Sequence, residues 1–467
     1  MFIRYINKFV FQIRRIHTNV IVIGILGFLT NFSASIVHTT AVLFIGDTII
    51  SSNLLILIRN FSEAFANFYK IFGGIISDYC KKRKLFLVIG YVGVVFCKTM
   101  VTVVTLKKYI PISIIVYIYV INQFIDRCIN AIRDPARDAI ILETVKNTDP
   151  EFVNISFGIR KFITSLGSVF GGIFTFLLLW IIEYKFSIQF IYFVLFIPIF
   201  IMSIFIGKYL KKMYINIFVF FYLFLIKYLS KYLELSTIIY STAIVPVVLA
   251  TLLVVKKIQE VKKYTNNSSS DLSFKYIFKN YKEFKNIFII INILIFSSFG
   301  RICDLGIFKR GLELGISSYK IPLMFVVLYI SVALFSYFLS CIKDDQNYVF
   351  KTIFFCLSSL LLGNIILYKY TNFITFWIGL ILISGYLSLT DGVMSSIISR
   401  YIPNEGLTAT VFGLTYGFTG LFLMLNGVFT FILRKYIFTS FQNIHGVMCV
   451  PILIAILILI YFRKELV

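Results

Sequence analysis

The chain has 467 residues, of which 59% are hydrophobic and 14% are charged, and its mean hydropathy is +0.91. Soluble domains average about 25% charged residues, so this composition excludes an ordinary water-soluble protein. The formal net charge is +24. In so apolar a chain this charge indicates Lys and Arg at the cytoplasmic ends of membrane-spanning helices, and not a nucleic-acid partner.

The first part of the chain holds six apolar runs that are long enough to cross a bilayer, at about 20 residues per crossing. They fall at 19–45, 53–77, 85–106, 110–131, 155–180 and 186–207. Each is expected to be a helix, because backbone amides in hydrocarbon must be satisfied internally. Lys and Arg gather after the second, fourth and sixth runs. This asymmetry predicts that residues 1–18 are cytoplasmic.

The middle of the chain departs from this spacing. Residues 19–212 are expected to form a six-helix half. We interpret residues 213–256, with two further apolar stretches, as an inserted transmembrane hairpin, the alternative being one interfacial helix and a tight loop. Residues 257–285 are rich in Lys, Asn and Ser and predict a flexible cytoplasmic linker.

Residues 286–462 contain a second set of six runs, and 463–467 are expected to form a cytoplasmic tail. The runs fall at 286–308, 320–342, 349–368, 372–399, 407–433 and 447–462. Two sets of six spans joined by a linker are common among secondary transporters. The predicted fold class is therefore an all-α polytopic membrane protein with two six-helix halves and both termini in the cytoplasm.

The segment GGIISDYCKKRK, between the second and third runs, resembles the signature of the major facilitator superfamily. Gly74, Asp78 and Arg83 match that signature, whereas Tyr79 and Lys81 depart from it. A Gly lets two helices approach closely, and an Asp can accept hydrogen bonds from a facing helix end. The resemblance implies alternating access, a gate at this loop and a location in the plasma (bacterial inner) membrane.

The segment DRCINAIRDPARDAIILE, residues 126–143, resembles the PRDA-type segment that follows the fourth helix in one bacterial group of facilitators. The resemblance places gate contacts here, and we expect a network with Asp78 and Arg160. A topology signal combined with helix capping is the alternative explanation. The gate residues expected in this segment are Asp126, Arg127, Arg133, Arg137 and Asp138.

One face of the second run carries Arg59, Glu63, Asn67 and Lys70, spaced by 4, 4 and 3 residues. A charge at the bilayer centre costs about 2.5–3.5 kcal/mol, so such residues must pair or face a wet cavity. We expect this face to line a translocation pathway, with Glu63 a candidate proton carrier. The alternative is an Arg59–Glu63 pair, with Lys70 reaching the headgroups.

Four more polar residues are expected along the pathway. Lys98, deep in the third run, is either a cavity cation or the partner of an acid such as Glu63. Arg301 and Asp304 are three residues apart and can neutralise each other. Asp391 has no obvious partner nearby in the sequence and is expected to line the pathway.

The sequence therefore predicts a secondary active transporter and not an enzyme. The three histidines form no catalytic pair with an acid, no phosphate-binding loop occurs, and the cysteines lack metal spacing, so no cofactor or metal is expected.

The expected partners are a small-molecule substrate, H⁺ as coupling ion and the lipid bilayer, and the chain is expected to be a monomer. The cations favour an organic anion, a zwitterion or a phosphorylated metabolite. The alternatives are a nucleotide or phosphorylated-metabolite exchanger and a non-transporting helix-bundle protein.

Overall fold

The computed structural model describes residues 16–41, 52–104, 112–183, 235–260, 274–342, 347–403 and 407–466. Within these ranges the regular elements are all helices, and no strand occurs. Nine helices in the described residues are long and apolar enough to cross a membrane. The predicted all-α membrane fold class is confirmed.

The first half consists of long helices that follow the predicted runs. They are α2 (Thr18–Ala41), α4 (Ser52–Cys80), α5 (Arg83–Val104), α6 (Ile112–Lys146), α7 (Val153–Glu183), preceded by the 3-10 turn η3 (Pro150–Phe152), and α10 (Leu235–Lys257). α6 extends well beyond the predicted end at 131 and continues through Pro135. The prediction ended there because charges follow, but those charges pair with one another, so the helix tolerates them.

The second half repeats this pattern, with two interrupted spans. Its helices are α12 (Lys285–Phe299), α13 (Asp304–Glu313), α14 (Ile321–Ser340), α15 (Tyr348–Lys369), α16 (Phe373–Ser388), α17 (Met394–Ser399), α18 (Thr408–Ile432) and α19 (Phe441–Tyr461). The predicted run 286–308 breaks between α12 and α13, and a π-helical turn, η5 (Leu389–Val393), joins α16 to α17. Smaller elements are α11 (Phe274–Lys279), η4 (Ser318–Lys320) and the π-helical turn η7 (Leu433–Ile437).

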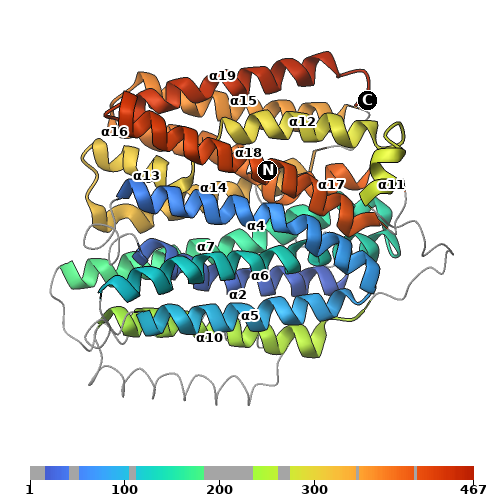
Figure 1. Ribbon diagram of the computed structural model, residues 1–467, viewed down its shortest axis with the longest axis horizontal. Helices are drawn as coiled ribbons and strands as arrows, with labels where there is room; N and C mark the ends of the chain where they lie inside the picture. The colour runs from blue at the N-terminus through green and yellow to red at the C-terminus, as the bar shows by residue number, and fades with distance from the viewer. Residues whose placement is uncertain are drawn as a thin grey trace, which may run out of the picture.

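The two halves form two packed groups of helices, with the first-half helices in the lower part of Figure 1 and the second-half helices in the upper part. α4 packs along α18 and α7 packs along α14, so these four helices make up most of the contact between the halves. Glycines bring α4 and α18 close together. A Cβ on Gly74 would collide with the Ala409 carbonyl, and one on Gly413 would collide with the Lys70 carbonyl.

The position of α10 bears on the predicted hairpin. α10 packs against α2 and α5 just as α19 packs against the corresponding second-half helices, α12 and α15. This packing favours α10 as the sixth helix of the first half, a role that we predicted for residues 186–207. Residues 184–234 lie outside the described residues, so the hairpin and the domain boundary at 212 stay predictions.

Candidate functional site: a charged cavity between the halves

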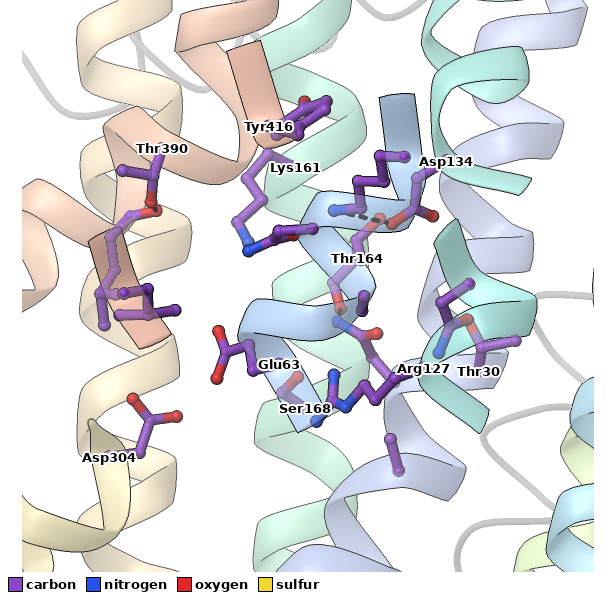
Figure 2. A pocket seen from close by; sticks show the side chains of 18 of the residues that line it. Thr30, Glu63, Arg127, Asp134, Lys161, Thr164, Ser168, Asp304, Thr390 and Tyr416 are labelled. Carbon is purple, nitrogen blue, oxygen red and sulfur yellow. Dashed lines mark hydrogen bonds and ion pairs between the residues drawn. The ribbon is translucent and has the colours of Figure 1, made fainter. Parts of the chain in front are cut away.

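A cavity of about 290 Å³ lies at the junction of the two halves. Its wall comes from α2, α4, α5, α6 and α7 on one side, and from α12, α13, α14, α16, α17 and α18 on the other. Figure 2 shows side chains from both halves converging on this space. The break between α12 and α13 places Arg301 in the wall, which fits the rule that irregular backbone at membrane depth lines a cavity.

Most of the residues predicted along the pathway lie in this wall. They are Arg59, Glu63, Asn67, Lys70, Lys98, Arg301 and Asp304. Asp391 is in the π-helical turn η5, but its side chain lies outside the described part of the structure. The wall also contains five of the residues predicted for the gate, namely Asp126, Arg127, Arg133, Arg137 and Arg160.

Glu63 forms an ion pair that crosses between the halves. Its Oε1 lies 3.6 Å from a guanidinium nitrogen of Arg301, which is also 3.8 Å from Asp304 Oδ1. The Tyr329 hydroxyl donates a hydrogen bond to the Asp304 carboxylate at 3.4 Å. The predicted Arg301–Asp304 contact is therefore present, and Glu63 extends it to α4.

Lys98 lies beside Asp126, whereas Glu63 was the acid that we named as an example of its partner. Its Nζ lies 4.0 Å from Asp126 Oδ1, and both residues line the cavity. Asn130 donates a hydrogen bond to the other carboxylate oxygen of Asp126 at 3.3 Å. Asp126 thus lies between Lys98 of α5 and the amide of Asn130, in the cavity wall.

Asp134, which the sequence analysis did not select, is the centre of a cationic cluster. It lies 2.9 Å from Arg137, 3.2 Å from Arg133 and 3.4 Å from Lys70. The Lys70 ammonium also sits 4.4 Å from the centre of the Tyr416 ring on α18. The signal in the sequence was the position of Asp134 between two arginines, one and three residues away, on the same helix.

Asp138 is fully buried and connects the halves. It accepts a hydrogen bond from Arg137 at 2.9 Å and lies 3.9 Å from Arg160. From the second half, the Tyr416 hydroxyl donates to the same carboxylate at 2.9 Å and Ser395 donates at 3.2 Å.

Asp78 makes a second contact between the halves, at the loop between α4 and α5. Its carboxylate accepts hydrogen bonds from the backbone N–H and the hydroxyl of Thr410, both at 2.7 Å. Arg83 lies 2.9 Å from Asp78 and 2.5 Å from Glu143. Asp78 and Arg160 therefore belong to two clusters, whereas we had expected one network. Gly74 packs against the same end of α18.

Several polar residues of the wall were not selected from the sequence, and most of them carry hydroxyl groups that look ordinary in an apolar run. They include Thr30, His38, Lys161, Thr164, Ser168 and Thr390. Lys161 reaches into the space between the halves (Figure 2), and its side chain packs on Gly392, where a Cβ would be 2.7 Å from the Lys161 Cβ. The signal for Lys161 was a second cation beside Arg160 inside a predicted span.

Comparison with known proteins agrees with this architecture, although no protein-family model matches the chain. An uncharacterised MFS-type transporter from Methanocaldococcus jannaschii is 26% identical over 174 residues, which are 37% of this chain and 40% of the relative. The chain therefore matches less than half of that relative's length.

Solved structures match nearly the whole chain. The human organic anion transporter MFSD10 has a TM-score of 0.64 at 12% identity, covering 94% of this chain and 99% of that one. The major facilitator superfamily transporter FucP in its outward conformation has a TM-score of 0.59 at 11% identity, covering 96% and 98%. The nucleoside transporter NupG has a TM-score of 0.58 at 12% identity, covering 95% and 99%.

These likenesses define the class: the chain has the fold of the major facilitator superfamily, a membrane fold with several apolar helices. The resemblance seen at the loop after the second helix is confirmed at the level of the fold. The PRDA-type subgroup stays a prediction.

Proposed function

We propose that this protein is a secondary active transporter that moves a small solute by rocker-switch alternating access. The observation that supports it is the cavity at the junction of the two halves, walled by charged residues from both. A bundle that served only as a scaffold would gain nothing from so many buried charges, each of which is costly in a membrane. This argues against the non-transporting alternative.

The gate in this proposal consists of the contacts that cross between the halves at one end of the cavity. Asp78 binds Thr410, and Asp138 binds Ser395 and Tyr416. Hydrogen bonds to charged groups contribute roughly 1.5–3 kcal/mol each. The free energy needed to break a few of them is small enough for substrate binding to offset. The closed and open states of the gate can therefore have similar free energies.

The orientation follows from the distribution of Lys and Arg in the sequence. With both termini in the cytoplasm of a cell whose plasma membrane holds the chain, the Asp78 end is the cytoplasmic one. In this proposal the contacts at Asp78 close the cavity on its cytoplasmic side. The chain acts as a monomer in this proposal.

The substrate class follows from the charge of the wall. Among the described residues, nine Lys or Arg and four Asp or Glu line the cavity. A cavity with one dominant sign of charge concentrates ions of the opposite sign. This supports an organic anion, in line with the substrate class in the name of MFSD10. A phosphorylated-metabolite or nucleotide exchanger is the second candidate, which the same surplus of cations favours.

Proton coupling is assigned to Glu63, with Asp391 as the second acid. Protonation of Glu63 would remove the charge that holds Arg301 across the boundary between the halves. Arg301 would then be available to the anion, and the halves would be free to rotate. A neutral acid also costs less to move through a low-dielectric region than a carboxylate does.

The direct test is uptake by proteoliposomes containing the purified protein, with a library of labelled metabolites and an imposed pH gradient. We expect saturable uptake of an anionic solute that increases with an inward proton gradient, and counterflow when the inside is preloaded. Asp78→Asn should lower the rate while the cavity still binds substrate. Failure of every library member in both uptake and counterflow would contradict the proposed transport function.

A further inference from the structure

The surplus of positive charge in the cavity wall comes from one half alone. Eight of the nine lining cations and three of the four lining acids belong to α4, α5, α6 and α7. The second half adds only Arg301 and Asp304 among its described lining residues, and these two pair with each other at 3.8 Å. The electrostatic attraction for an anion is therefore directed to the first-half side of the cavity.

Arg127 is the cation of this wall best placed to receive a ligand. Within the described residues, its guanidinium has no ion pair with any Asp or Glu, in contrast to Arg133 and Arg137. Its Nε is buried without a hydrogen-bond partner, and so is Thr164 Oγ1, which belongs to another residue of the wall. Figure 2 shows Arg127 in the cavity wall, with Ser168 and Thr164 among the other labelled lining residues. Buried polar atoms are nearly always satisfied, so these orphaned groups indicate a ligand with acceptor oxygens.

The facing wall has a different character. Phe325 and Tyr329 of α14 lie with their ring centres 4.4 Å apart and both line the cavity. Leu387 of α16 and Met394 of α17 also line the cavity from the second half. An aromatic pair offers a binding surface for a flat apolar group.

We infer that the substrate is an organic anion with a ring-shaped apolar body, held with its charged group toward Arg127 and its ring against Phe325 and Tyr329. This inference rests on the proposed transport function and adds the substrate's shape and orientation. The cavity of about 290 Å³ suits such a molecule, because a cavity of roughly 150 Å³ already holds benzene. The remaining space accommodates one carboxylate or phosphate group and a few waters.

The first test uses the purified full chain in detergent and measures its thermal unfolding with four probes. Benzoate and phenyl phosphate carry a ring and an anion, benzyl alcohol has only the ring, and inorganic phosphate has only the anion. A ligand that binds the folded state raises the unfolding temperature by mass action. We expect at least one ring anion to raise it more than both benzyl alcohol and inorganic phosphate at equal concentration.

The order of the two ring anions separates a carboxylate from a phosphate as the bound group. Equal or larger stabilisation by benzyl alcohol or by inorganic phosphate would overturn the inference. So would the absence of a shift with both ring anions at millimolar concentration. This series needs no mutant and so stands even if a variant fails to fold.

The second test measures the affinity of the better ring anion for Arg127→Gln. A charge-assisted hydrogen bond is lost, so we expect affinity to fall roughly 10-fold or more. Arg127→Lys should retain part of the affinity, and Lys369→Met, a change at an exposed cation outside the cavity, should leave it unaltered. Wild-type affinity in a folded Arg127→Gln would refute the assigned anion position.

Counterflow in proteoliposomes separates this inference from the proposed function. Transport of some other solute without binding of a ring anion would overturn the inference and leave the function intact. Binding of a ring anion without counterflow of any solute would contradict the transport function, whereas the assigned binding position of the anion would stand.

Discussion

The two halves share one helical plan but treat charge in opposite ways. The first half places its cations and acids in and beside the cavity wall, where Asp134 and Asp138 are each held by more than one basic side chain. The second half contacts acids of the first half through neutral groups. Ser395 and Tyr416 bind Asp138 through their hydroxyls, and Thr410 binds Asp78 through its backbone N–H. The first half therefore supplies most of the charged groups, and the second half supplies neutral groups that bind them. A neutral group can leave a charged partner at a lower cost in free energy than an oppositely charged group can.

This contrast predicts unequal effects when one cross-half contact is cut from each side. Asp138→Ala removes a buried carboxylate that binds Arg137, Ser395 and Tyr416, and removing one partner of a buried ion pair costs about 3–5 kcal/mol. Ser395→Ala removes one neutral donor and should cost about 1 kcal/mol. Thermal unfolding of the purified proteins checks both values. Equal destabilisation by the two substitutions would contradict the proposed difference between charged contacts from the first half and neutral contacts from the second.

The contact between α4 and α18 gives a second comparison, based on shape. Gly74→Val forces a side chain into the Ala409 carbonyl, so overpacking should destabilise the protein by about 1–3 kcal/mol. Thr99→Val, at an exposed position on α5, serves as the matched control and should change little. A Gly74→Val protein as stable as the control would show that α4 and α18 do not pack so closely in the membrane.

Glu63→Gln tests whether the ion pair across the halves couples transport to protons. We expect uptake driven by a pH gradient to fall at least about 10-fold, because the amide cannot take up a proton and its bond to Arg301 no longer depends on pH. Counterflow, which needs no proton gradient, should persist. Glu151→Gln, on the exposed turn before α7, is the control.

Pairing this change with Asp391→Asn asks whether the second acid matters. Uptake that still follows the pH gradient in the double variant would remove both residues from the coupling scheme.

The smallest effect is expected where a charge pair lies outside the cavity. Lys285 and Glu465 are 2.9 Å apart, with side chains 49% and 35% exposed. Exposed pairs contribute about 0–1 kcal/mol, so Lys285→Ala should barely change the unfolding temperature. A loss as large as that of Asp138→Ala would mean that burial does not govern these energies.

Much of the fold could be read from the sequence because hydrocarbon imposes simple rules. Apolar runs gave the helices α14 and α15 nearly to the residue, and the polar face of the second run marked α4 as a cavity helix. The end of α6 was misjudged because charged residues look like a loop when their partners are unknown. Asp134 meets Lys70 of another helix, and no pattern along one helix contains that information.

The site was predicted less completely than the fold for a related reason. Charges inside a span are conspicuous, so Arg59, Glu63 and Lys98 were found. Hydroxyls such as Thr30 and Ser168 occur in many apolar helices, and only their convergence in three dimensions distinguishes them. The split between Asp78 and Asp138 into two clusters also depends on which second-half residues face each one.

The π-helical turn Leu389–Val393 has a consequence for the register of its span. In an α-helix, residues five positions apart point about 140° away from each other. In the wider π-helical turn, residues five positions apart point in more similar directions, because its hydrogen bonds join residues i and i+5. Thr390 can therefore look into the cavity while Ser395, five residues later, meets Asp138. Deleting one residue of this turn would tighten the coil and move Ser395 away from the Asp138 carboxylate, which would break a hydrogen bond between the two halves.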